Sequence, residues 1–216
     1  MFKLCRLFSL MLAVLVAAGM ALAPSVGAQQ TPTPEQARTF VGNIAGLENI
    51  DAKFVAIVAP DNRAVAFLGS RDDNFNRMYA KWYVGAINGN SFVGTASDGT
   101  LLTGTRQGDT ITGTVAGGQW TGNLTQTGTA GLYRNRVSDT ETDVAIVAPD
   151  GSWVGMAINP TNGQLIRTWN SGTGVVERVA NSTAIRVQPD PDSPPVQLDP
   201  VAPNPSAGFC YSSPFC

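Results

Sequence analysis

The sequence predicts an all-β protein, in which an antiparallel meander closes into a small up-and-down β-barrel; a β-sandwich is the alternative. The chain is rich in Gly and Thr and has no long stripe of apolar residues at helical spacing. Short alternating segments are separated by turns of Gly, Asp and Asn. Glycines also recur in the middle of predicted strands, where they permit the sharp coiling of a small barrel. These glycines are Gly85, Gly94, Gly104, Gly113 and Gly122.

The first 28 residues are predicted to be a signal peptide. Lys3 and Arg6 flank the start of an apolar stretch, and small residues before Gln29 place the cleavage after Ala28. An uncleaved membrane anchor is the alternative, although the apolar core is short for a span. We therefore expect an exported protein, either secreted or located in the periplasm or at the cell surface, with no stable transmembrane span after cleavage. Residues 29–37 are read as an N-terminal linker.

Residues 38–186 are predicted to form one β-barrel-like domain. Within it the heptapeptide VAIVAPD begins at Val55 and again at Val144, and each copy runs into a second apolar stretch. Both copies predict hairpins, over residues 55–68 and 144–158, with Asp-Asn and Asp-Gly as the turn residues. Because VAIVA is apolar on both faces, each copy should lie in a buried, central part of the sheet. We interpret the pair as a duplicated hairpin that extends one sheet.

Between the hairpins, residues 91–125 predict a meander of four short strands. In TITGTV (residues 110–115) the apolar and glycine positions share one face and the three threonines share the other. One face therefore packs and the other meets water. Further strands are expected over residues 82–87, 131–137 and 164–169.

Residues 187–216 are predicted to be a disordered, proline-rich tail, because proline lacks a donor and favours extended chain. Eight of the 14 prolines fall here. After signal cleavage the remaining cysteines are Cys210 and Cys216 in CYSSPFC, which we expect to form a disulfide in an oxidising compartment. Two thiols kept for linking to another molecule are the alternative.

Taken in order, several segments resemble a β-rich domain of secreted and membrane-tethered bacterial proteins. That family opens with a Phe/Tyr-x-Gly-x-Val strand, continues with a dG-x-L-x-G meander and an AGLYR strand, and ends in a hairpin. The resemblance covers about residues 39–158. It implies a small β-barrel-like fold in an exported protein, and it transfers no activity and no functional residue. The matching segments are FVGNIAG, FVAIVAPDNRAVAFL, GTLLTGTRQGDTITGTV, AGLYR and DVAIVAPDGSWVGMAI.

The available side chains limit the chemistry. The chain has no histidine, which removes Ser-His-Asp and Cys-His catalysis and histidine-ligated metals. Two basic residues leave with the signal, so 14 become 12 against 16 acidic ones and the net charge falls from −2 to about −4. Nucleic acid is disfavoured because no basic face is present. A carboxylate pair, a Ser-Lys pair and a hard-cation site are the remaining options, and we expect no enzyme.

Two sets of residues are candidates for a binding site. Exposed aromatic side chains on strands could stack on sugars or insert at a protein interface, although burial in the core is the simpler expectation. These are Trp82, Tyr83, Trp120, Trp153 and Trp169. The polar segment SRDDNFNR, expected to be a surface loop, offers oxygen ligands for Ca²⁺ at a spacing unlike an EF-hand. These are Asp72, Asp73, Asn74 and Asn76. No other cofactor is expected.

The sequence therefore favours an exported, non-enzymatic binding or surface-interaction module, whose ligand or partner it does not name. A carbohydrate-binding or glycan-active protein and a structural protein of the cell envelope are the alternatives.

Overall fold

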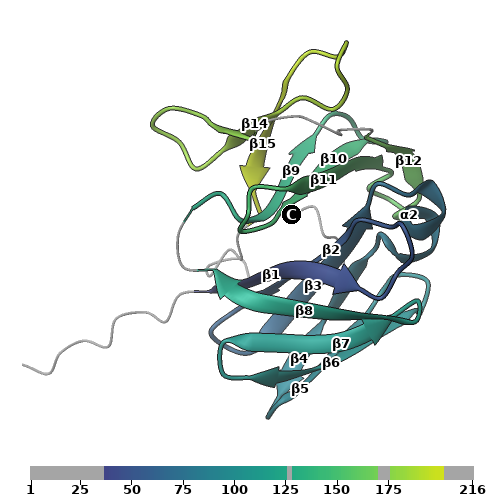
Figure 1. Ribbon diagram of the computed structural model, residues 1–216, viewed down its shortest axis with the longest axis vertical. Helices are drawn as coiled ribbons and strands as arrows, with labels where there is room; N and C mark the ends of the chain where they lie inside the picture. The colour runs from purple at the N-terminus through teal and green to yellow at the C-terminus, as the bar shows by residue number, and fades with distance from the viewer. Residues whose placement is uncertain (1–36, 126–127, 170–175, 202–216) are drawn as a thin grey trace, which may run out of the picture. The chain divides into compact units, whose positions relative to one another are not determined.

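The computed structural model describes residues 37–125, 128–169 and 176–201. These residues fold almost wholly as antiparallel sheet (Figure 1). A closed barrel of eight strands comes first and a separate seven-stranded sheet follows it along the chain. The predicted all-β class and the up-and-down barrel are confirmed. Among the described residues, no helix is long and apolar enough to cross a membrane.

The barrel is a simple meander in which each strand pairs with the next and the last returns to the first. β8 closes it by pairing with β1, with Phe40 opposite Leu124 and Ile44 opposite Trp120. The strands are β1 (Arg38–Ala45), β2 (Ala52–Val58), β3 (Arg63–Ser70), β4 (Trp82–Asn88), β5 (Ser91–Thr95), β6 (Leu101–Gln107), β7 (Thr110–Val115) and β8 (Gly118–Thr125).

The second sheet follows a similar up-and-down path but does not close. Its strand order is β12-β11-β10-β9-β15-β14-β13, so the last strand in the chain, β15, pairs with the first, β9, and the two edge strands are β12 and β13. Among the described residues no strand bridges those ends. The strands are β9 (Gly131–Arg136), β10 (Thr142–Val147), β11 (Trp153–Ile158), β12 (Leu165–Thr168), β13 (Glu177–Arg178), β14 (Ile185–Val187) and β15 (Val196–Pro200).

The prediction that the second hairpin extends the sheet of the first is wrong. β2–β3 belongs to the barrel, whereas β10–β11 lies in the middle of the second sheet. The reason is geometric: eight strands close the barrel before the second hairpin begins, and a closed barrel has no free edge for another strand to join.

The two copies of VAIVAPD nevertheless form hairpins of the same geometry. Val58 pairs with Ala64, and Val147 pairs with Trp153 89 positions later. In each turn only the third loop residue has a positive φ, 65° at Asn62 and 82° at Gly151. The loop therefore has three residues. The amide of the third donates to the alanine carbonyl before the proline, as in a type I turn with proline at its second position, and that third residue lies in the left-handed region. The expected two-residue turn is wrong because proline already fixes the first loop position.

The predicted two-sided burial of the first copy is confirmed. Phe54, Ala56 and Val58 point into the barrel core. Val55 and Ile57 point outward and pack in a second cluster with residues of β10 and β11. The outer surface of β1–β4 is thus covered by the second sheet.

The folded part extends beyond the predicted boundary at residue 186. β15 pairs with β14 and also with β9, through Asp199 and Pro200. Leu198 is fully buried. The proline content suggested a solvated tether, but the strand begins after Pro195 and reaches a proline only at its last residue, Pro200, so its other residues keep their backbone donors. The remainder of the predicted tail, with Cys210 and Cys216, lies outside the described residues, as do the signal peptide and almost all of the linker.

Candidate functional site

Trp120 belongs to the barrel core. Its ring is fully buried and stacks on Phe54 with centroids 4.1 Å apart. Gly104 and Gly113 make room for the indole, because a Cβ at either position would lie 2.3 or 2.2 Å from its atoms. Trp120 therefore presents no ring to a ligand.

Trp82 and Tyr83 point to opposite faces of β4, as alternation requires. Tyr83 lies inside the barrel and Trp82 lies in the cluster between the barrel and the second sheet, 4.9 Å from the Phe67 ring. Burial raises the pKa of Tyr83 above its ordinary value. Both side chains are therefore buried, because the second sheet covers the outer side of β4 at Trp82.

Trp153 and Trp169 lie in a third apolar cluster, on the face of the second sheet that points away from the barrel. Their rings meet edge to face with centroids 6.1 Å apart, and both are buried. Gly155 lies beneath Trp169, since a Cβ there would be 2.1 Å from the indole. The structure therefore gathers no exposed aromatic set from the five candidates.

The segment SRDDNFNR is not a surface loop. It leads into a short helix, α2 (Asp73–Tyr79), and Asp72 caps that helix by accepting a hydrogen bond from the Phe75 amide at 2.7 Å. Asn76 is buried and donates to the Ser70 carbonyl and to Thr168 Oγ1, both at 2.9 Å.

The four predicted oxygen ligands are therefore not brought together for a cation. Asp73 forms an ion pair with Arg77 one turn later, while Asp72 caps and Asn76 holds the helix to β3 and β12. Nor does any group of three or more His, Cys, Asp or Glu side chains within the described ranges form a metal site.

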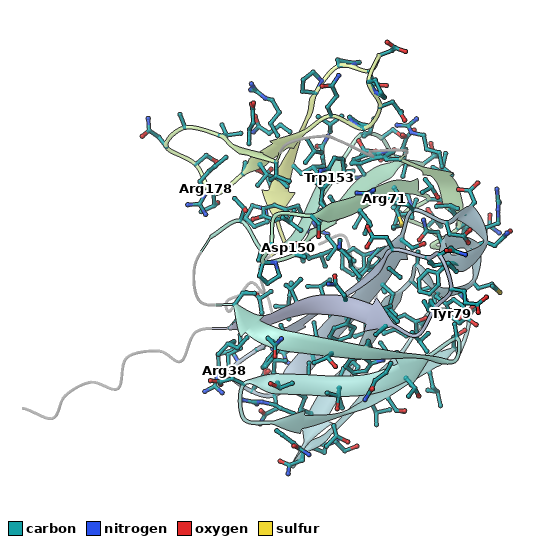
Figure 2. The ribbon with its side chains drawn as sticks, viewed as in Figure 1. Arg38, Arg71, Tyr79, Asp150, Trp153 and Arg178 are labelled. Atoms are coloured by element: carbon teal, nitrogen blue, oxygen red, sulfur yellow. The ribbon has the colours of Figure 1, made fainter. Side chains whose placement is uncertain are left out.

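The structure does bring together a serine and a lysine that sequence spacing had not paired. Lys53 Nζ donates to Ser152 Oγ at 2.8 Å and to Asn43 Oδ1 at 3.2 Å, and it lies 3.3 Å from Asp51 Oδ1. Its side chain is only 2% exposed. Asp150 belongs to the same turn as Ser152, and Arg71 Nη2 lies 3.5 Å from the carbonyl oxygen of the next residue, Trp153; Figure 2 labels all three of Arg71, Asp150 and Trp153. A lysine inside the apolar run AKFVAIV was the one available sequence signal.

The Lys53–Ser152 pair is arranged as a structural hydrogen bond and not as a nucleophile with its general base. A catalytic lysine must accept the proton of the serine, whereas Lys53 is the donor and Ser152 Oγ donates in turn to Asp150 Oδ1 at 2.6 Å. The hydrogen bond from the Ser152 side chain also lowers the pKa of Asp150, which makes that carboxylate a weaker base. The chain of hydrogen bonds fastens the β10–β11 turn to β2.

A carboxylate pair occurs at the start of β10. Asp143 is 2% exposed, and its Oδ1 has no hydrogen bond and lies 3.8 Å from the Arg167 guanidinium. That guanidinium is 2.9 Å from Glu141. Desolvation, reinforced by Glu141 and opposed by Arg167, raises the pKa of Asp143 to about 6. A glycosidase needs its two carboxylates on opposite sides of a substrate; these are two residues apart in the chain and share one arginine.

The most distinctive surface is the outward face of β5–β8, which we call the threonine face. Within these four fully described strands, no outward side chain is charged. Arg106 occupies one of the inward positions of β6, and its guanidinium carbon lies over the Phe40 ring, 5.6 Å from the ring centroid. The outward residues are Ser91, Val93, Thr95, Leu101, Thr103, Thr105, Gln107, Thr110, Thr112, Thr114, Gln119, Thr121, Asn123 and Thr125.

Hydroxyl side chains are aligned across the threonine face. Ser91 pairs with Thr105, Thr105 with Thr112, and Thr112 with Thr121. This row spans three strand spacings, about 14 Å. On the same face, Val93 and Leu101 are 42% and 63% exposed. The alternation in TITGTV predicted one strand of this face, but register across four strands was needed to see it.

Comparison with protein-family models, with curated proteins and with solved structures finds no match, so the site is defined by its geometry alone.

Proposed function

We propose that the protein is an exported, non-enzymatic surface-interaction module that contacts its partner through the threonine face. One observation carries this proposal. The outer surface of β1–β4 packs against the second sheet, whereas the outer surface of β5–β8 carries no charge and exposes two large apolar side chains. An uncharged area of this kind costs less to desolvate than an ordinary charged surface.

Three further features favour this proposal over an enzyme or a small-molecule carrier. The barrel interior is occupied by fully buried rings, among them Phe40, Phe92 and Trp120. The Ser152–Lys53 contact runs in the wrong direction for a nucleophile. The Glu141–Asp143 pair shares a single arginine.

Export and the covalent details are part of the same proposal. The basic and apolar N-terminal segment supports cleavage after Ala28, and the spacing of Cys210 and Cys216 supports a terminal disulfide. The common register of the two VAIVAPD hairpins supports their origin by duplication. Peptide mass mapping of the exported protein under non-reducing conditions tests both the cleavage point and the disulfide.

Binding to cell envelopes tests the role of the threonine face. The exported wild type should co-sediment with the envelope fraction of the cells that secrete it. Thr105→Lys/Thr112→Lys places two charges in the hydroxyl row and should abolish co-sedimentation. The matched control Thr140→Lys/Thr161→Lys adds the same charge at exposed loop positions and should behave as wild type. Equal co-sedimentation of the row variant and wild type would refute the proposal.

A further inference from the structure

The chemistry of the threonine face restricts the kind of partner that it can bind. An ionic partner would lose hydration at this face without gaining an ion pair, because no outward side chain of β5–β8 carries a charge. A purely apolar partner would bury the hydroxyl row without supplying hydrogen bonds, which costs free energy for each unsatisfied group. The face therefore suits a neutral partner with many hydroxyl groups.

The arrangement of the hydroxyl row indicates how a polymeric partner would lie relative to the strands. Three members of the row, Thr105, Thr112 and Thr121, face outward at directly paired positions on β6, β7 and β8. Each hydroxyl can donate one hydrogen bond and accept others. At about 4.8 Å per strand the row offers a repeated set of donors and acceptors across the barrel and not along one strand. A linear polymer lying across the strands would meet one hydroxyl at each.

The flanking residues supply the second element of such a contact. Val93 is two positions from Ser91 on β5 and pairs with Thr103, and Leu101 pairs with Thr95. Both therefore lie on the same outward face as the row, and both are exposed. Val93 is about 7 Å from the row along its strand and Leu101 about 13 Å, so Val93 is the one within reach of a chain bound along the row. Sugar rings combine hydroxyl edges with apolar C–H faces, so this combination of hydroxyl and aliphatic side chains matches them. The buried tryptophans have no part in it.

We infer that the threonine face binds a neutral polysaccharide chain, which lies across β5–β8 along the row from Ser91 to Thr121 with Val93 against its sugar rings. This inference rests on the proposed function, since it names the partner of the same face.

The test uses the full exported chain and insoluble neutral polysaccharides as probes: cellulose, chitin, starch granules and a β-1,3-glucan. Wild type should bind at least one of them, with an affinity that is the same at low and at high salt, because screening acts on charges only. Thr105→Val/Thr112→Val/Thr121→Val keeps the shape and removes three hydroxyls. At about fivefold for each hydrogen bond, it should weaken binding on the order of 100-fold.

The matched control is Thr105→Ser/Thr112→Ser/Thr121→Ser, which keeps the hydroxyls and should stay within a few-fold of wild type. Thermal unfolding checks that both variants are folded. Wild type that co-sediments with envelopes but binds none of the four probes overturns this inference and leaves the surface-interaction proposal standing. Binding that falls steeply with salt, or a valine variant that binds as wild type does, also overturns it.

Discussion

Asp143 provides a test of the second sheet, because its environment sets a pH-dependent cost of folding. The carboxyl is 2% exposed, its Oδ1 has no hydrogen bond, and burial raises its pKa from 3.8 to about 6. The charged groups that face it are Arg167, which opposes the shift, and Glu141, which adds to it. Asp143→Asn replaces the titrating group by a neutral one of the same size.

The sign and the size follow from the two pKa values. Between pH 3.8 and about 6 the unfolded chain releases this proton before the folded protein does, so the free energy of unfolding of wild type falls as the pH rises. A shift of about two pKa units corresponds to about 3 kcal/mol. The free energy of unfolding of Asp143→Asn does not include this fall, because the variant has no carboxyl at that position. The stability of the variant relative to wild type should therefore increase by about 3 kcal/mol between pH 3.5 and pH 7.5.

The assay is urea unfolding of both proteins at a series of pH values. Differences between them cancel the titration of the carboxylates that do not interact with Asp143. For a chain of this length the change corresponds to a relative increase of roughly 6–12 °C in Tm. Asp139→Asn, at a side chain that is 96% exposed, is the control and should show no comparable trend. A stability difference that is constant with pH, or that decreases as pH rises, would refute the reasoning.

Three further predictions concern stability, each measured by chemical unfolding. Gly113→Ala puts a Cβ 2.2 Å from Trp120 and should cost about 1–3 kcal/mol, whereas Gly131→Ala meets only contacts of 3.6 Å or longer and should cost less; equal costs would contradict the account of the barrel interior. Lys53→Met keeps most of the packing but removes the hydrogen bonds to Asn43 and Ser152, and we expect the free energy of unfolding to fall by about 2 kcal/mol. An unchanged free energy of unfolding would mean that these hydrogen bonds contribute nothing to stability. Asp72→Ala removes the cap of α2 and should cost about 1 kcal/mol, while Asp72→Asn, which can still cap, should cost little.

The barrel could be predicted because its signals are local. The alternation of TITGTV assigns faces within one strand, and the glycine turns set the strand lengths. The two-sided apolar run VAIVA required a partner on each face, which the structure supplies as the barrel core and the second sheet. Strand count and closure are different, since they depend on how β8 meets β1. The sequence therefore did not show that the second hairpin would lie in a separate sheet.

The features that sequence reasoning missed depend on contacts between distant residues. Asn76 appeared to be one of four surface oxygen ligands, but its amide is buried against Ser70 and Thr168, 92 positions away along the chain in the latter case. Lys53 and Ser152 are 99 positions apart. The tryptophans looked like ligand-binding candidates because alternation gives a face but not the element that covers that face. The threonine face required the register of four strands.

The most direct test of the central claim is to ask whether a partner covers the threonine face. Thr112→Cys and, as a control, Thr161→Cys are each prepared in the exported chain, and the rate of maleimide alkylation at the new thiol is followed by peptide-resolved mass spectrometry with and without the envelope fraction. Envelope binding should slow alkylation at position 112 and leave position 161 unchanged. Equal rates at position 112 with the protein fully bound, or slowing confined to position 161, would contradict the claim that β5–β8 form the interacting surface.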